Sequence, residues 1–277
     1  MKKLLLLLAL PAALHAAPQA ELWDDWLPHN PESHRTLDHS RWDLLLDGHL
    51  VTDDPSGVHL FDYDGVSPDD YQVLSEYLAY LGDVKVYDLT RDEQMAYWIN
   101  LYNALTIQVI LDHWPVASIR DINLGGLFTR GPWKAALMEV QGQQISLDDI
   151  EHRILRPIWN DARIHYAVNC ASIGCPNLQP WAFTHENLEE LLEAAAVEFI
   201  HHPRAVKVSG RTLNLSSIFD WFSEDFGDSR EGILAHIMGY ASEELQEDLA
   251  PFLTGSGRIR YSYDWSINAG DRRSSGE

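Results

Sequence analysis

The first third of the chain has apolar residues at helical spacing. Residues 42–46 and Tyr71–Leu81 repeat apolar side chains every three or four positions, which predicts amphipathic helices. Ser67, followed by a proline and two aspartates, is a typical helix start. The longest pattern of this kind, Thr90–His113, is apolar on two opposite sides. It therefore predicts a central helix that is buried all round.

The long helix carries polar groups that demand partners. Thr90 with Glu93 three residues later has the sequence of a capping box. A projection at 100° per residue places Asn100 and Asn103 on one buried stripe. Buried asparagine side chains must be hydrogen-bonded. We expect both residues to act as clamps on an adjacent loop rather than in catalysis.

The rest of the chain mixes short strand patterns with helical ones, without a regular βαβα order. This mixture predicts an α+β fold, mostly helical with a small antiparallel sheet. The expected elements are a hairpin (Ala135–Val140 with Gln143–Ile145), a helix from Ser146 to about Arg156, a strand (Arg163–Val168), a helix (Glu186–His202), a second hairpin (Val206–Val208 with Thr212–Leu215), helices over Ser216–Leu249 and a last strand (Arg258–Tyr263).

Residues 1–17 have the layout of a secretory signal peptide. Two lysines precede the apolar run Leu4–Leu14, and small residues follow at Ala16 and Ala17. The run is too short to span a bilayer, and no later segment is long enough. We expect an exported protein, periplasmic or secreted, without membrane insertion.

The charge balance restricts the partners. The chain has 20 Lys and Arg against 42 Asp and Glu, a formal net charge of −22, and loss of the predicted signal peptide would remove two lysines. Such a surface repels nucleic acid and anionic lipid, so neither is expected as a partner. No glycine-rich phosphate loop or dinucleotide fingerprint is present, and no cofactor is expected.

Both cysteines of the chain, Cys170 and Cys175, lie in the turn-forming stretch after the predicted strand. Reactive groups are often presented on a loop that a rigid element holds. In one hypothesis Cys170 is a nucleophile that needs a base, which His152 or His165 would supply. We favour His152, because His165 is five extended residues from Cys170.

The helix predicted after Ser146 supplies candidates around that base. Glu151 falls inside an apolar stripe and His152 lies at its edge, so Glu151 needs a partner or a raised pKa. Asp148, four residues before His152, lies on the same face and would orient the imidazole. The alternative is that Glu151 forms an ion pair with Arg156 or Arg163 and that His152 is merely exposed.

Other residues have supporting roles in this hypothesis. Asn169 would hold the loop or line an oxyanion hole, and Ser172 with the amides after Cys170 would complete that hole if a helical turn began there. Arg130, Trp133 and Lys134 are candidate substrate contacts, because an aromatic ring beside cations suits an anionic or planar group. Simple surface exposure is the alternative for this trio.

Two other interpretations of the cysteines stay open. An even cysteine count in an oxidising compartment favours a Cys170–Cys175 disulfide, either structural or redox-active. Metal ligation by the two cysteines and a histidine is the least favoured, because no second paired-ligand motif appears.

Five motifs together resemble the domain-of-unknown-function 547 family (DUF547), over roughly Asp88–Asn268. They are YWINLYNA (97–104), GPWK (131–134), SLDDIEHRIL (146–155), RIHYAVNCASIGCP (163–176) and YDWSIN (263–268). The resemblance implies that Cys170 and the Glu151–His152 pair are retained in the family, whereas Cys175 is replaceable. It favours a Cys–His pair on a papain- or transglutaminase-like scaffold with a permuted order, His before Cys.

The resulting expectation divides the chain into a helical region (18–87), a family core domain (88–268) and a disordered tail (269–277) after the signal peptide. The predicted function is a thiol-dependent hydrolase or acyltransferase acting on a small molecule or peptide, with Cys170, His152 and Glu151 as catalytic residues. The alternative is a non-catalytic binding or scaffold module with a Cys170–Cys175 disulfide. No oligomeric state is predicted.

Overall fold

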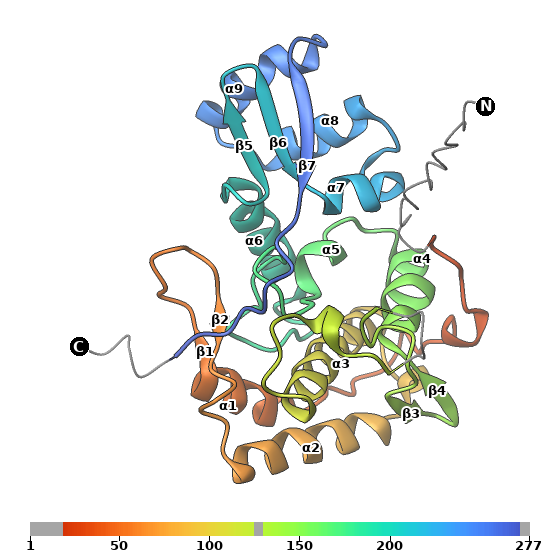
Figure 1. Ribbon diagram of the computed structural model, residues 1–277. Helices are drawn as coiled ribbons and strands as arrows, with labels where there is room; N and C mark the ends of the chain where they lie inside the picture. The colour runs from red at the N-terminus through yellow and green to blue at the C-terminus, as the bar shows by residue number, and fades with distance from the viewer. Residues whose placement is uncertain (1–18, 125–129, 272–277) are drawn as a thin grey trace, which may run out of the picture.

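A computed structural model describes residues 19–124 and 130–271 (Figure 1). The predicted signal peptide lies outside the described residues. The helices α1–α3 gather at one end of the molecule, and α8, α9 and the strands β5–β7 gather at the other (Figure 1). Two hydrophobic clusters correspond to these ends, and residues on both sides of residue 87 contribute to the first.

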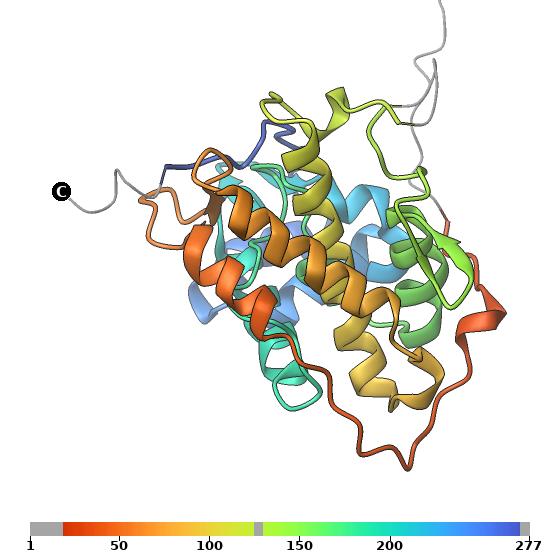
Figure 2. The ribbon, with the colours of Figure 1, turned by 90° about the horizontal axis from the view of Figure 1, so that it is seen from below.

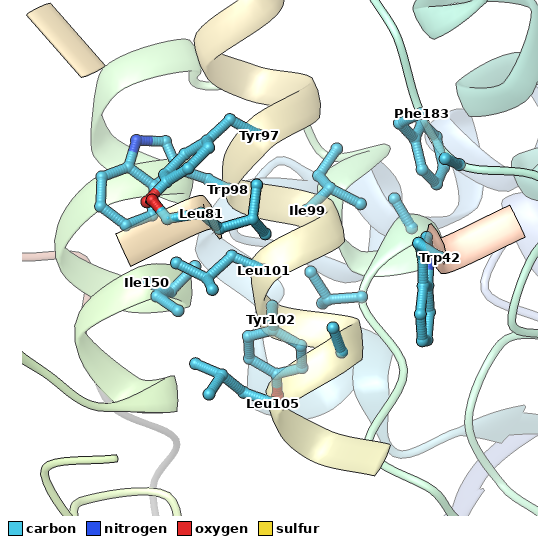
Figure 3. Packing of buried hydrophobic residues seen from close by; sticks show 14 of the residues in the cluster. Trp42, Leu81, Tyr97, Trp98, Ile99, Leu101, Tyr102, Leu105, Ile150 and Phe183 are labelled. Carbon is cyan, nitrogen blue, oxygen red and sulfur yellow. The ribbon is translucent and has the colours of Figure 1, made fainter. Parts of the chain in front are cut away.

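The first cluster is built around α3 (Arg91–Asp112), whose residues from Glu93 to Ile107 are all buried. Helices α1 (Ser40–His49) and α2 (Pro68–Gly82) lie side by side across it (Figure 2). Figure 3 shows Tyr97 and Trp98 projecting from α3 into this packing. The predicted central, fully buried helix is therefore confirmed.

The predicted helix starts are confirmed in part. Ser67 caps α2 in a reciprocal capping box with Asp70. Thr90 caps α3 by accepting from the amide of Glu93. The carboxylate of Glu93 does not complete a capping box, because it instead accepts hydrogen bonds from the Leu37 amide (2.6 Å) and from His185 Nδ1 (2.9 Å).

The strands form three small sheets. Strand β1 (Leu50–Val51) pairs with β2 (Leu60–Phe61), and β3 (Met138–Val140) pairs with β4 (Gln143–Ile145). The third sheet has the order β5 (Val206–Ser209), β6 (Thr212–Ser216), β7 (Arg258–Ser262). Both predicted hairpins are confirmed, and so is the last strand.

Strand β7 pairs with β6 in parallel, unlike the other strand pairs of the three sheets, because a helical crossover lies between them. That crossover contains α7 (Ile218–Trp221), the 3-10 helix η5 (Ser223–Phe226), α8 (Arg230–Tyr240) and α9 (Glu243–Leu253). With α6 (Leu188–His201) these elements pack into the second hydrophobic cluster.

One prediction about local structure is wrong. The strand expected at Arg163–Val168 is the short helix α5 (Ile164–Ala167), next to which the Asp161 side chain accepts from the Arg163 amide (2.9 Å). Every residue of α5 is buried, so tertiary packing overrides the strand propensity.

The helix expected after Ser146 is confirmed, and Ser146 Oγ accepts from the Asp149 amide (3.1 Å) at its start. Most of this helix is a π-helix, η4 (Asp149–Leu155), which continues as α4 (Arg156–Trp159).

Three further 3-10 turns complete the described chain: η1 (Asp24–Trp26), η2 (Val86–Asp88) and η3 (Ile119–Asp121). Ala269 and Gly270, the first residues of the predicted tail, pair with Phe61, and residues 272–277 lie outside the described residues. In the described ranges, no helix combines the length and apolarity needed to cross a membrane. The α+β class is confirmed, whereas the permuted papain-like arrangement stays a prediction.

Candidate functional site

The cysteine loop is anchored to α3 by Asn103. The side-chain amide of Asn103 donates to the carbonyl of Ala167 (2.9 Å), and its oxygen accepts from the amide of Asn169 (2.8 Å). Asn169 then closes the loop on itself, donating to the Pro176 carbonyl (2.7 Å) and accepting from the Ala171 amide (2.8 Å). The backbone on either side of Cys170 is thus fixed by two buried amides.

Asn100 makes an equivalent clamp elsewhere. Its side chain donates to the Phe183 carbonyl (2.7 Å) and accepts from the Phe183 amide (3.0 Å). It therefore holds the segment before α6 rather than the cysteine loop.

The C-terminal segment after β7 returns along the cysteine loop (Figure 1). The amides of Ile173 and Gly174 donate to the carbonyls of Ser266 and Asp264, each at 2.8 Å. A Cβ atom on Gly174 would lie 2.8 Å from the Asp264 nitrogen, so only glycine permits this close approach. The contact brings Tyr263 beside Cys170.

Three polar groups converge at the thiol of Cys170. Its Sγ lies 3.1 Å from each of Cys175 Sγ, Ser172 Oγ and Tyr263 OH. Cys170 is partly exposed, whereas Cys175 is buried. Residue Ala171, directly after the thiol, has a φ of 57°, which strains a side chain other than glycine.

The expected Cys170–Cys175 disulfide is not formed in the structure. Both residues are free thiols, and their 3.1 Å separation exceeds the roughly 2.05 Å of a sulfur–sulfur bond. In the described part of the chain, no group of three His, Cys, Asp or Glu side chains is placed to hold a metal ion.

The surroundings shift the pKa values of the two thiols in opposite directions. The hydrogen bond from Cys175, followed by those from Ser172 and Tyr263, lowers the pKa of Cys170 against the opposing effect of burial. Burial and the neighbouring Cys170 raise the pKa of Cys175 well above its usual value. Cys170 is thus the residue of the pair that ionises first.

The amide oxyanion hole was expected if a helical turn began at Cys170, and the loop has no such turn. The Cys170 amide donates to Cys175 Sγ (3.0 Å), the Ala171 amide to Asn169, and the amides of Ile173 and Gly174 to the C-terminal segment. Donors that already have partners inside the protein are not available to a substrate. The hydroxyls of Ser172 and Tyr263 are the donors that face the thiol.

His152, the favoured base, does not contact Cys170. In the described residues no hydrogen bond or ion pair joins Cys170 to His152 or His165. His152 Nδ1 lies 3.2 Å from Arg156 Nη1, and Nε2 lies 3.8 Å from Asp148 Oδ1. Because arginine is only a donor, Nδ1 must accept, and the neutral ring then carries its proton on Nε2.

Glu151 lies between two imidazoles. Its Oε1 is 3.6 Å from His165 Nδ1 and 3.9 Å from His152 Nδ1. Burial opposes ionisation, but His152, His165 and Arg156 lower the pKa of Glu151 to about 2. Of the two arginines considered for Glu151, Arg156 acts on it through its charge and also pairs with Glu224 and Asp225, whereas Arg163 pairs with Asp161 and Glu189.

His165 is a buried link rather than a free base. Its Nε2 donates to Asp225 Oδ2 at 2.6 Å, and its ring stacks on Phe222 at 4.2 Å. Burial opposes protonation, yet the hydrogen bonds to Asp225 and Glu151 raise the pKa of His165. Asp148 differs from the other carboxyl on its helix, Glu151: burial and the charge of Glu151 raise the pKa of Asp148 to about 6.

An aromatic wall lies beside the thiol. We use this name for Trp133, Trp221, Tyr263 and Trp265, whose rings are 4.6–5.8 Å apart in successive contacts. Each ring is partly exposed. Gly131, at φ 80°, leaves room for the Trp133 ring, which a Cβ atom would strike.

The other two predicted substrate contacts lie apart from this wall. Lys134 lines a cavity of about 310 Å³ that also contains Asp148 and His152. Arg130 is exposed. Of the predicted site residues, the structure therefore gathers Cys170, Ser172, Asn169 and Asn103 through the cysteine loop, and Glu151, His152 and Asp148 on the preceding helix. The two groups are close enough for the charge of Glu151 to act on the Cys170 thiol.

Sequence reasoning assigned no role to Tyr263. The only signal for it was the YDWSIN motif, because nothing in the local pattern indicates a contact with a residue 93 positions earlier. The same applies to Trp265, whereas Trp221, which completes the aromatic wall, lies outside all five motifs.

Residues 86–200 match the family described as "Protein of unknown function, DUF547", which confirms the predicted family over this segment. The match includes Cys170 and His152 but ends before Tyr263. Searches of curated proteins and of solved structures found no match.

Proposed function

We propose that this chain, a DUF547 member through residues 86–200, is a thiol-dependent hydrolase or acyltransferase with Cys170 as its nucleophile. The observation that carries the proposal is the set of three hydrogen-bonding groups within 3.1 Å of Cys170 Sγ. Groups that donate to a thiolate stabilise it and make the sulfur a competent nucleophile near neutral pH.

In this proposal hydrogen bonds replace the histidine base. Cys170 attacks an acyl carbon as a thiolate, and the bond from that carbon to its leaving group breaks. The leaving group departs with the electron pair and takes a proton from solvent, while the acyl group stays on Sγ as a thioester. Water or an acceptor nucleophile then cleaves the thioester and restores Cys170. The hydroxyls of Ser172 and Tyr263 face the sulfur and lie 2.9 Å from each other; as the sulfur loses its charge to the new bond, they rotate to donate to the oxyanion that develops beside it. The aromatic wall is the surface against which a planar or apolar substrate group would pack.

The carboxylate and imidazole cluster has a positioning role in this account. Glu151, His165, Asp225 and Arg156 join η4 and α5 to η5 through buried charges. They fix α5, which leads into the cysteine loop, and η5, which follows Trp221 of the aromatic wall; none of them makes a hydrogen bond to the reacting sulfur.

The test is acylation of the reduced protein by p-nitrophenyl acetate, followed by mass spectrometry of its peptides. We expect the acetyl group on Cys170, with p-nitrophenolate release falling at least about tenfold in Cys170→Ser. Cys175→Ser is the matched control and should retain acylation. Equal release by Cys170→Ser, with the acetyl group found on lysines instead, would contradict the proposal.

The rival function is a non-catalytic binding or scaffold module stapled by a permanent Cys170–Cys175 disulfide. A thiol titration of protein purified without reductant, under native and denaturing conditions, distinguishes the two functions. The module predicts no thiol in either condition, whereas the proposed nucleophile predicts a reactive native thiol that disappears in Cys170→Ser.

A further inference from the structure

The proposed function leaves one nucleophilic group without a role. Cys175 is buried, with 4% of its surface exposed, and its Sγ lies 3.1 Å from that of Cys170. Acyl transfer needs only one thiol. A second thiol in contact with the first, shielded from solvent while the first is accessible, has the arrangement of an attacking and a resolving cysteine.

We propose that Cys170 and Cys175 form a thiol–disulfide exchange site, in which Cys170 attacks a substrate disulfide and Cys175 resolves the mixed disulfide. The inference rests on the nucleophilic Cys170 of the proposed function and adds a second activity to the same loop. Its substrate class is a small-molecule or protein disulfide.

The reaction balances in two steps. The Cys170 thiolate attacks one sulfur of the substrate disulfide, forming a mixed disulfide and releasing the other sulfur as a thiolate. Cys175, after losing its proton to solvent or to the released thiolate, attacks Cys170 Sγ. The second substrate thiolate leaves, the Cys170–Cys175 disulfide forms, and two electrons have passed from the protein to the substrate.

The loop geometry suits the second step. The two Sγ atoms must approach by only about 1 Å to reach bonding distance. The Cys170 amide already donates to Cys175 Sγ at 3.0 Å, so it would stabilise the negative charge on Cys175 as it attacks.

A cation lies close to the resolving thiol. Arg204 donates from Nη1 to the Ile173 carbonyl inside the loop (3.4 Å), and its charge interacts with Cys175. A guanidinium at this position favours the thiolate form of Cys175. The resting pKa of Cys175 is nevertheless raised, which keeps it protonated until Cys170 has reacted.

The exchange also regulates the first activity. Once the disulfide has closed, Cys170 has no thiolate for acyl transfer, and the hydroxyls of Ser172 and Tyr263 face a neutral sulfur. Reduction by an external thiol reverses the two steps and restores the nucleophile.

The test is reaction of the reduced full chain with oxidised glutathione, quenched in acid and read by intact and peptide mass. We expect the wild-type protein to end as the Cys170–Cys175 disulfide, two hydrogens lighter and free of glutathione. Cys175→Ser and Cys175→Ala should both stop as a stable glutathione adduct on Cys170, and Cys170→Ser should react at least about tenfold more slowly.

Each other outcome overturns a defined part of the account. A stable glutathione adduct on the wild-type protein, equal to that of Cys175→Ser, overturns the resolving role and leaves Cys170 as a nucleophile. If p-nitrophenyl acetate still acylates Cys170 but oxidised glutathione produces neither an adduct nor the Cys170–Cys175 disulfide, the exchange activity alone is overturned. A Cys170 inert to both reagents overturns the proposed function as well.

Discussion

The reactivity of Cys170 depends on the small polar groups around its sulfur. Ser172, Tyr263 and Cys175 each lie at 3.1 Å, and each has one proton to direct at a thiolate. Hydrogen bonds to a charged group contribute about 1.5–3 kcal/mol each, enough to change a thiol pKa by about one to two units. No imidazole is needed for a shift of this size.

A second residue, Asp148, has a pKa raised to about 6 by burial and by the charge of Glu151. Because the folded carboxyl holds its proton more tightly than the unfolded one, the folded state is favoured below pH 3.8. That advantage is lost as the pH rises through about 6. At higher pH the ionised Asp148 destabilises the fold.

Asp148→Asn should therefore stabilise the protein at pH 8 by about 1–3 kcal/mol and have little effect at pH 3.5. The measurement is urea unfolding of the variant and the wild-type protein at both pH values. Asp149→Asn is the matched control, because Asp149 forms an ion pair with Arg153 and its removal should cost stability at pH 8. If the free energy of unfolding differed between Asp148→Asn and the wild-type protein by the same amount at both pH values, the raised pKa of Asp148 would be contradicted.

At the scale of elements, α3 fixes two separate segments through two asparagines one turn apart. Asn103 holds the cysteine loop and Asn100 holds the segment at Phe183, each by a pair of buried hydrogen bonds. An unsatisfied buried backbone group costs about 1–3 kcal/mol, so each clamp matters to stability. Only one of the two matters to the thiol.

Asn103→Ala and Asn100→Ala should each lower the free energy of unfolding by about 2–4 kcal/mol, since each leaves two buried backbone groups unpaired. Only Asn103→Ala should change the rate at which iodoacetamide alkylates Cys170 at pH 7. Denaturant unfolding and alkylation kinetics on the same preparations provide both values. If the alkylation rate of Cys170 changed equally in the two variants, Asn103 would have no specific effect on the cysteine loop.

Helical periodicity explains why some of these elements could be predicted from the sequence. Apolar positions that repeat about every 3.6 residues over a long segment predicted α3 and its two buried asparagines. They did not predict which loops these asparagines hold. The π-helix η4 turns less per residue than an α-helix, so a projection at 100° misplaces the residues on it. Glu151 and His152 are consequently both buried, at 7% and 6% exposure.

The strand prediction for Arg163–Val168 was wrong for a different reason. Its alternation and strand-forming residues favour a β-strand, yet Ile164 belongs to the first hydrophobic cluster and Tyr166 to the second. A short helix buries both sides at once. Local propensity does not contain that information, because it depends on what packs against each face.

At the scale of the whole molecule, the site exists because distant segments meet. The cysteine loop lies within the family match, whereas Tyr263 and Trp265 come from the C-terminal return and Trp221 from the crossover before β7. Sequence motifs contain the cysteine loop, Tyr263 and Trp265, but not Trp221. Their meeting depends on contacts between residues more than 90 positions apart, which no local pattern encodes.

This long-range assembly favours one of two explanations for the lowered pKa of the Cys170 thiol. If Cys170 were activated by the preceding helix, His152 would set its pKa, as the sequence suggests. In the structure the C-terminal return supplies Tyr263 instead, whereas His152 contacts Arg156 and makes no hydrogen bond to the sulfur. The two explanations make opposite predictions for one experiment.

That experiment is the pH dependence of Cys170 alkylation by iodoacetamide in the reduced wild-type protein, Tyr263→Phe and His152→Gln. The account predicts a wild-type thiol pKa below the ordinary value, a rise of about one unit in Tyr263→Phe, and no change in His152→Gln. A pKa that rises in His152→Gln and stays unchanged in Tyr263→Phe would contradict it.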